Sequence, residues 1–286
     1  STDGARPVTR ASRLRAPEGF AAVPGGEGVL FVRLDLEEAA RALALDSPGA
    51  WEEAVAAGRA GPGRGARGRI AFPGGPVAVA KRMRRGGLLA PLWRDRFAIA
   101  SRLVENVEVP RAAAARGIAT AAPLALLLIE GPIRLWRGWL AVEEIPDAED
   151  LETRLASGRP PERGELAAAV ALVRRAHDAG IEHRDLNLGN VLVRRGRPAG
   201  PEAFLVDLDR ARLHARPLGF CKRAAAVRRL ERSYLKRFGA AGPLGRDPGA
   251  LLRSLYAAGD RALGSRFRAI RPLDRVLIAL HRPRRR

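Results

Sequence analysis

The stretch from His183 to Asn190 constrains this chain more than any other, because it places the carboxylate of Asp185 five residues before the amide of Asn190. The chain contains three Asn and no Gln, so two rare amides, Asn187 and Asn190, fall within four residues of each other. Downstream, Asp207 directly follows a short apolar run. A carboxylate can accept the proton of an attacking hydroxyl, and an amide and a carboxylate can together hold a divalent cation.

The residues 183–190 match H-R-D-L-x-x-x-N, the catalytic loop of protein-kinase-like enzymes. A His-Asp turn with an Asn cap before a strand is the structural alternative. That alternative leaves Asp207 and the features upstream without a reason. We therefore expect Asp185 to be the catalytic base, and Asn190 and Asp207 to hold the Mg²⁺ that bridges the phosphates of ATP.

Two upstream features fit nucleotide binding. Gly63, Gly65 and Gly68 match G-x-G-x-x-G, a loop whose backbone can close over phosphates, although chance could produce this match in a glycine-rich region. Lys81 ends the apolar strand predicted for residues 77–81, after a turn at 73–76. Only three of the 51 basic residues are Lys, and a compact ammonium fits between phosphate oxygens and a carboxylate. The alternative for Lys81 is a surface position on an edge strand.

Glu105 and Glu108 are candidates for the carboxylate that pairs with Lys81, since residues three apart share a helix face. A solvated pair of glutamates is the alternative, and the sequence does not choose between them. We expect a mostly helical segment over residues 92–117, kinked or split by Pro110. Glu143, Glu144 and Ile145 follow an apolar strand, and their backbone is predicted to contact the adenine edge.

Strands early in the chain and helices late predict an α+β, bilobal protein-kinase-like fold, with a small β-rich N-lobe and a mainly helical C-lobe. We expect a flexible arm over residues 1–20, an N-lobe over 21–142, a hinge over 143–147 and a C-lobe over 148–286. The C-lobe ends in the basic tail 282–286.

The net charge of +20 attracts phosphates, either of nucleic acid or of an anionic membrane. The sequence contains no run of about twenty apolar residues, so no membrane span is predicted. The first residues show no secretion signal, and the single Cys221 fits a reducing compartment. We therefore expect a cytoplasmic protein, with peripheral contact at the inner membrane as an option for the basic tail. The four His and one Cys do not have zinc-ligand spacing.

Three motifs resemble the lipopolysaccharide kinases of Gram-negative bacteria, in particular the 3-deoxy-D-manno-octulosonic acid (Kdo) kinases. They are the D-L-N of 185–187, the V-D-L-D-R-A of 206–211 and the R-R-G-G-L of 84–88. The Arg-rich segment 223–236 is similar to a helix of that family. The resemblance covers roughly residues 61–238.

The resemblance implies ATP-dependent phosphorylation of a sugar hydroxyl, on Kdo or heptose, in the inner core of lipopolysaccharide. The expected partner is a lipopolysaccharide precursor or another anionic glycolipid, and no nucleic acid is expected. Guanidinium groups bind carboxylates and phosphates in bidentate fashion. Four arginines are candidates for contacts to the acceptor: Arg84, Arg85, Arg210 and Arg212.

Two alternatives remain. A kinase-fold phosphotransferase could act on a protein, an antibiotic or a metabolite. The short segment after Asp209 and the lack of an A-P-E motif argue against a peptide acceptor. A non-enzymatic basic binding protein is the other alternative. Intact Lys81, Asp185, Asn190 and Asp207 argue against it, and so does the low aromatic content of 5%.

Overall fold

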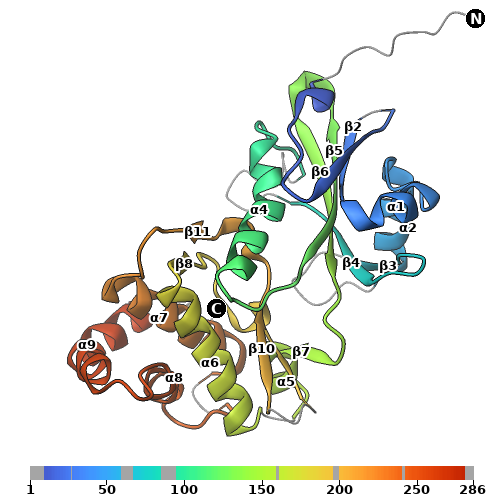
Figure 1. The fold of residues 1–286 in the computed structure, drawn as a ribbon. Coiled ribbons are helices and arrows are strands. Elements are labelled where there is room, and N and C mark those ends of the chain that lie inside the picture. The colour runs from blue at the N-terminus through green and yellow to red at the C-terminus, as the bar shows by residue number, and fades with distance from the viewer. Residues whose placement is uncertain are drawn as a thin grey trace, which may run out of the picture. The chain divides into compact units, whose positions relative to one another are not determined.

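The computed structural model describes residues 10–26, 28–58, 67–84, 95–158, 161–195, 200–239 and 242–280 (Figure 1). The chain forms two compact units: unit 1 comprises Ser1–Arg111 and Ala121–Glu144, and unit 2 comprises Ala112–Thr120 and Ile145–Arg286. One border, between Glu144 and Ile145, falls inside the predicted hinge. The assignment of residues 112–120 to unit 2 departs from the predicted lobe boundaries.

Unit 1 is built on a sheet whose described strands follow the order β1-β2-β5-β6-β4-β3, with every neighbouring pair antiparallel. The strands are β1 (Phe20–Pro24), β2 (Gly28–Arg33), β3 (Arg67–Ala71), β4 (Val77–Arg82), β5 (Pro123–Glu130) and β6 (Trp136–Glu143). Gly74 lies in the turn between β3 and β4 with a φ of +66°, a conformation that glycine adopts without strain. The predicted strand, turn and strand around Lys81 are confirmed.

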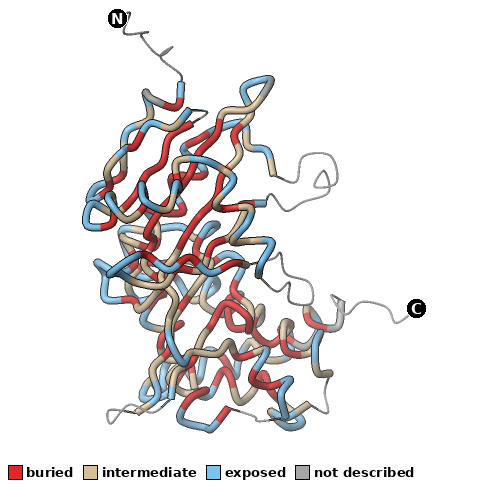
Figure 2. The backbone as a smooth tube through the Cα atoms, turned by 90° about the vertical axis from the view of Figure 1, so that its right-hand side faces the viewer, coloured by how far each residue is buried: buried red, intermediate tan, exposed pale blue. Residues whose placement is uncertain are grey.

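Both faces of this sheet are covered, because its central strand β5 carries apolar residues at successive positions. Side chains alternate between the two faces of a strand. Leu126 and Leu128 pack on one face with Leu103 of α4 (Ser101–Ala115). Leu127 packs on the other face with Trp51 of α2 (Pro48–Ala57). The buried stretches of the tube in Figure 2 follow these strands. Unit 1 also contains α1 (Glu37–Ala42) and short 3₁₀ turns at η2 (Leu34–Leu36) and η3 (Pro132–Arg134).

The predicted loose arm over residues 1–20 is wrong for its described part. Ala11, in the 3₁₀ turn η1 (Ala11–Arg13), is fully buried, and Phe20 begins β1 and is also buried. Both belong to the apolar cluster that contains Leu103. Burying these side chains offsets the entropy of ordering the segment. Residues 1–9 lie outside the described residues.

Helix α4 begins later than the sequence predicted. Residues 95–100 are not helical, and Phe97 instead forms a bridge with Trp136, the first residue of β6. The helix continues through Pro110 and is not split. Asn106 of this helix is buried. Its Nδ2 donates to the carbonyls of Arg102 (3.0 Å) and Leu103 (3.1 Å) within the same helix. A buried amide with partners in its own turn is compatible with a packed helix face.

Unit 2 is mainly helical in its described residues (Figure 1). Its helices are α5 (Leu151–Ala156), α6 (Arg163–Asp178), α7 (Phe220–Phe238), α8 (Pro248–Tyr256) and α9 (Arg261–Leu280). Two small antiparallel sheets accompany them, one with the order β10-β9-β7 and one that pairs β11 with β8. The strands are β7 (Ala148–Asp150), β8 (Ile181–Glu182), β9 (Val191–Arg194), β10 (Glu202–Leu205) and β11 (Arg212–Leu213). Helix α6 contacts both α8 and β10, and so joins the helices to the larger sheet.

A buried ionic cluster fixes the three C-terminal helices. Arg253 of α8 donates to Glu231 of α7 at 2.8 Å and lies 3.4 Å from Asp274 of α9, and all three side chains are buried. Arg228 of α7 also donates to Asp274, at 2.5 Å. Burial is the largest influence on Glu231 and raises the pKa of its carboxyl, although Arg253 opposes it. Removing Arg253 would take away the ion pair of the buried Glu231, and breaking a buried pair in this way is strongly destabilising.

His177 of α6 is buried, and its Nδ1 lies 2.7 Å from the hydroxyl of Tyr256 in α8. Burial lowers the pKa of this imidazole from 6.5 to about 3, and the positive charges of Arg223 and Arg229 contribute in the same direction. The folded protein therefore keeps His177 neutral at pH values where the unfolded chain protonates it. This linkage stabilises the fold above the unfolded pKa and is lost as the pH falls toward the folded value.

The acid sensitivity of the fold should depend on His177. Between about pH 7 and pH 5 this residue should cost the wild-type protein about 2 kcal/mol of unfolding free energy. His177→Gln should be less stable at pH 7 and should lose about 2 kcal/mol less on acidification. Urea unfolding at the two pH values measures both quantities. His183 and the carboxylates are common to both proteins, so equal losses in the two would contradict the assignment.

Candidate active site

The stretch 183–190 is a loop between two strands of unit 2. It follows β8 and ends in a 3₁₀ turn, η4 (Leu188–Asn190), directly before β9. Leu186 and Leu188 are buried and anchor the loop. Asp185, which precedes them, is exposed. The loop therefore presents a carboxylate to solvent from a fixed backbone.

Two amides hold the backbone of Asp185 in place. Asn187 Nδ2 and Asn190 Nδ2 each donate to the carbonyl oxygen of Asp185 at 3.0 Å. Asn187 Oδ1 also accepts from the N–H of Gly189 at 2.9 Å, which closes the turn. Sequence reasoning assigned a role to Asn190 and none to Asn187. Because the chain contains only three Asn, the presence of two of them in this loop indicated that both have a structural or functional role there.

His183 joins the loop to Val206, which lies between the end of β10 and Asp207. The imidazole is buried, and its Nε2 lies 3.0 Å from the carbonyl oxygen of Val206. A carbonyl oxygen only accepts, so Nε2 carries the proton. Burial is the main cause that lowers the pKa of His183; the Val206 carbonyl and the charges of Asp207 and Asp185 oppose it. His183 is therefore a neutral structural donor.

Asn190 and Asp207 lie at the same end of the β9–β10 pair. Val191, the first residue of β9, pairs with Leu205, the last residue of β10, and the N–H of Val206 donates to the carbonyl of Asn190 at 3.0 Å. Asp207 then adopts a left-handed conformation, with φ 62° and ψ 49°, as the cap of the 3₁₀ turn η5 (Leu208–Arg210). Among residues other than Gly, Asp and Asn reach this region at the lowest cost.

The donor chemistry of Asn190 and Asp207 suits a magnesium ion. Amide and carboxylate oxygens are hard ligands, and the amide nitrogen of Asn190 is already engaged with Asp185, which leaves Oδ1 for a cation. Across the described ranges, no three His, Cys, Asp or Glu side chains gather into a metal site. Mg²⁺ typically takes one or two carboxylates and completes its shell with water and phosphate oxygens, so two protein ligands fit it.

Lys81 lies in unit 1, on β4, where it pairs with Arg67 of β3. In the same register Gly68 pairs with Ala80. A Cβ on Gly68 would lie 2.0 Å from the carbonyl oxygen of Ala54 in α2, so close packing against α2 requires glycine here. The structure thus gives Gly68 a packing reason. Gly63 and Gly65 lie outside the described residues.

The candidate partners of Lys81 are both on α4 of the same unit. Glu105 and Glu108 are exposed, and each stays a prediction. Arg84, just beyond β4, is exposed, and Arg85 lies outside the described residues. The neighbouring Arg82 is held more firmly, since it pairs with Asp95 and lies over the ring of Trp139 at 5.6 Å.

The backbone of the predicted hinge is partly engaged by the sheet of unit 1. The N–H of Glu143 donates to the carbonyl of Ala122 at 2.7 Å, and the N–H of Glu144 donates to Val77 at 2.8 Å. The side chain of Glu144 forms an ion pair with Arg69 at 2.6 Å. The N–H groups of Glu143 and Glu144 are therefore engaged within unit 1.

Arg210 and Arg212 lie close in sequence to Asp207 and are both exposed. Arg210 ends η5, and Arg212 of β11 pairs in register with Glu182, which precedes the loop 183–190. Both arginines therefore belong to the same part of unit 2 as Asp185. The segment from here to α7, which begins at Phe220, is as short as the sequence indicated.

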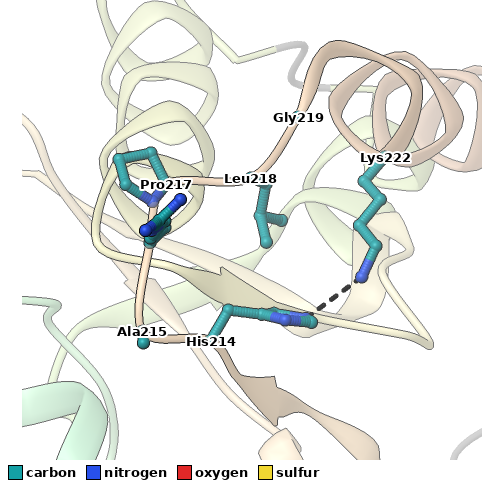
Figure 3. A pocket seen from close by; sticks show the side chains of 7 residues that line it. His214, Ala215, Pro217, Leu218, Gly219 and Lys222 are labelled. Carbon is teal, nitrogen blue, oxygen red and sulfur yellow. Dashed lines mark hydrogen bonds between the residues drawn. The ribbon is translucent and has the colours of Figure 1, made fainter.

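A charged group that the sequence did not reveal closes this segment. Glu182 accepts from Lys222 Nζ at 2.8 Å and lies 2.9 Å from His214 Nε2, and Lys222 and His214 are 3.2 Å apart. Burial raises the pKa of Glu182, but its two partners outweigh burial and lower it to about 2. Residues 214–219 and Lys222 line a hollow of about 330 Å³. Figure 3 shows the side chains of His214 and Lys222 directed toward each other. Lys222 is one of three lysines, which was the available signal.

The chain is similar to known proteins over most of its length. A model of the Lipopolysaccharide kinase (Kdo/WaaP) family matches residues 64–253. The chain is 31% identical over 231 residues to the 3-deoxy-D-manno-octulosonic acid kinase of Xanthomonas oryzae pv. oryzae (strain PXO99A), with 77% of this chain and 86% of that protein covered. It is 30% identical over 166 residues to the protein of the same name from Pasteurella multocida (strain Pm70), with 57% and 67% covered.

The corresponding protein of Xylella fastidiosa (strain M12) is 29% identical over 163 residues; the match covers 56% of this chain and 62% of that relative, which is less than two thirds of its length. Among solved structures, "WaaP in complex with acyl carrier protein" matches with a TM-score of 0.55 and 20% identity, over 91% of this chain and 96% of that one. At this identity the match shows the fold.

The predicted α+β, protein-kinase-like fold is confirmed by the likeness to WaaP. The prediction of a kinase for a lipopolysaccharide sugar is confirmed at the level of the family, since the family model covers most of the chain, including the loop 183–190. The chain belongs to the lipopolysaccharide kinase (Kdo/WaaP) family.

Proposed function

We propose that this protein transfers the γ-phosphoryl group of ATP to a hydroxyl of an inner-core sugar, Kdo or heptose, carried on lipid A. One observation supports the proposal above all others. The exposed carboxylate of Asp185 stands on a backbone that two amides hold, beside a strand end that carries Asn190 and Asp207. The names of the relatives favour Kdo as the acceptor sugar.

In this mechanism the acceptor hydroxyl attacks the γ-phosphorus, the bond from the γ-phosphorus to the β,γ-bridging oxygen breaks, and ADP leaves. Asp185 accepts the proton of the attacking hydroxyl. Asn190 and Asp207 would hold Mg²⁺, which when bound neutralises charge on the phosphate oxygens. The neutral His183 keeps the loop joined to Val206 and takes no proton from the acceptor.

Unit 1 supplies the nucleotide contacts in this proposal. Lys81 would bind phosphate oxygens and pair with Glu105 or Glu108, while the loop with Gly63, Gly65 and Gly68 would lie against the phosphates. Glu143, Glu144 and Ile145 would contact the adenine edge through their main chain. The strand pairing that positions Lys81 next to the end of this loop supports the assignment.

The acceptor is an acidic sugar on a phosphorylated lipid, and arginines are suited to both groups. Arg84, Arg85, Arg210 and Arg212 are the proposed contacts. We place the enzyme in the cytoplasm, in peripheral contact with the inner membrane, where its positive charge draws it to an anionic surface. No helix in the described part of the chain has the length and apolar character needed to cross a bilayer.

A protein acceptor is the second candidate. Protein kinases dock peptides on a long segment between the metal-binding Asp and the next helix. Here α7 begins at Phe220, and the short segment before it is tied back by Glu182, His214 and Lys222. This arrangement favours a small or glycolipid acceptor over a peptide.

Phosphate transfer from labelled ATP with Mg²⁺ should label Kdo-lipid A and should not label a generic protein offered in parallel. Asp185→Ala should lower the rate by about 10²- to 10⁴-fold, because a general base contributes that much. Thin-layer separation of the labelled glycolipid measures the transfer. Label on the protein alone would move the acceptor to the second candidate, and ATP binding without any turnover would point to a non-enzymatic binder.

The hydrogen bonds from Asn187 and Asn190 to the Asp185 carbonyl should affect the rate of phosphoryl transfer and leave substrate binding unchanged. Asn187→Ala removes one donor to the Asp185 carbonyl, so kcat should fall by about tenfold while the KM for ATP stays constant. Asn187→Asp separates the two contacts of this side chain, since it keeps an acceptor for the Gly189 N–H but loses the donor to Asp185. Its kcat should therefore fall as in Asn187→Ala. If Asn187→Asp retained the wild-type kcat, the donor to Asp185 would have no catalytic role.

Loss of the proposed acceptor arginines should raise the KM for the glycolipid and leave the KM for ATP unchanged. Arg84→Ala/Arg85→Ala and Arg210→Ala/Arg212→Ala are each expected to raise the acceptor KM by about tenfold, through lost charge-assisted contacts. Arg41→Ala/Arg102→Ala, at two exposed arginines of α1 and α4, controls for the loss of two positive charges. Unchanged acceptor kinetics in both double variants would reject the assignment.

A further inference from the structure

Helix α9 has a conventional buried face. Leu263, Phe267 and Ile278 are buried at helical spacing, and Asp274 among them joins the ionic cluster with Arg228 and Arg253. The ring of Phe267 meets those of Phe220 and Tyr256 edge-on, at 5.3 and 5.6 Å between centroids. This face fastens α9 to α7 and α8 and accounts for its place in unit 2 (Figure 1).

The opposite face of α9 is exposed and largely apolar, with Ser265 as a polar residue within it. We call it the exposed stripe; it consists of Ala262, Ala269, Pro272, Leu273 and Val276. Leu273 and Val276 are 58% and 57% exposed. Residues at spacings of three, four and seven share a helix face, so these side chains form one band along the helix. Single exposed apolar residues are ordinary, but a band opposite a buried face calls for a partner.

Arginines border the exposed stripe, and no exposed acid accompanies them on the helix. Arg261, Arg266 and Arg268 are exposed, and Arg266 lies over the ring of Phe220 at 4.2 Å, which holds its guanidinium beside the stripe. Arg268 donates to Ser265 Oγ at 2.8 Å. The single acidic residue in the sequence of α9 is Asp274, which is buried and paired. The sequence then continues with His281 and the basic tail 282–286, which contains four arginines.

We propose that the exposed stripe of α9 lies on an anionic lipid bilayer. Leu273 and Val276 enter the boundary between headgroups and acyl chains, and Arg261, Arg266 and Arg268 bind lipid phosphates. An apolar band flanked by arginines matches a helix that lies in the plane of a membrane. A nucleic acid would be matched by the arginines alone and would give the apolar side chains no contact. The inference deepens the proposed function, because a glycolipid acceptor resides in such a bilayer.

The test uses the full-length protein and sedimentation with vesicles of phosphatidylethanolamine and phosphatidylglycerol in equal parts. The wild-type protein should bind these vesicles, bind phosphatidylcholine vesicles far less, and lose affinity as salt is raised. Leu273→Asp/Val276→Asp should weaken binding by about tenfold or more, because it places charge where apolar side chains enter the membrane. Both positions are exposed, so circular dichroism and the melting temperature should stay at wild-type values.

The matched control is Leu34→Asp/Ile99→Asp, which adds the same charge at apolar residues of unit 1 that are 61% and 59% exposed. It should bind vesicles like the wild type. If both double variants bind equally, the exposed stripe is not the membrane contact. If the stripe variant alone changes sedimentation velocity without vesicles, the stripe joins two copies of the chain and the proposal is overturned.

Phosphate transfer to Kdo-lipid A separates this inference from the proposed function. With the acceptor dispersed in detergent, the stripe variant should turn over like the wild type; with the acceptor in vesicles, it should be slower. Failure of the wild-type protein to phosphorylate the glycolipid in either form would reject the proposed function and leave the vesicle result standing. Equal slowing of the stripe variant in both forms would reject the membrane role.

Discussion

The carbonyl oxygen of Asp185 is the point on which the candidate site depends. A base that must reach a substrate has to be exposed, and an exposed side chain has no packing to fix it. Here the main chain is fixed instead: Asn187 and Asn190 donate to one carbonyl, and the Asn190 carbonyl in turn accepts from Val206. His183 closes the circuit from the other side. The β9–β10 pair, the loop 183–190 and Asp207 are thereby tied together. The ties are made to backbone groups, so the carboxylate of Asp185 takes no part in them.

The cores of the two units are built in different ways, although both draw on a composition rich in Ala, Arg and Leu. Unit 1 uses the apolar strand β5 to bury a sheet on both faces, so that the strand carrying Lys81 is held by its neighbours. Unit 2 uses long Arg-rich helices. The buried carboxylates of Glu231 and Asp274 form ion pairs with arginines of these helices and so balance their charge inside the core. A composition rich in Ala, Arg and Leu therefore serves packing as well as surface charge.

Much of this could be predicted from the sequence where chemistry and spacing coincide. The loop 183–190, the strands around Lys81 and the helices α6 and α7 follow from local patterns. The rest depended on distant partners. Arg-rich residues 10–20 looked unstructured because nothing local shows that Ala11 meets the core around Leu103. That packing also requires glycine at position 68 could not be predicted, because nothing in the sequence shows that this residue approaches the carbonyl of Ala54 in α2. The pairing of Glu182 with His214 and Lys222 joins residues 32 and 40 positions apart.

The left-handed backbone at Asp207 restricts what evolution or an engineer can place there. Most residues would add about 1–2 kcal/mol of strain in that conformation, whereas Asn and Gly are tolerated. An inactive but fully folded reference protein is therefore better made as Asp207→Asn than with Ala, since Asn keeps the shape of the side chain and the turn into η5. Position 207 is therefore constrained by its backbone torsion angles as well as by the oxygen that we propose to bind the metal.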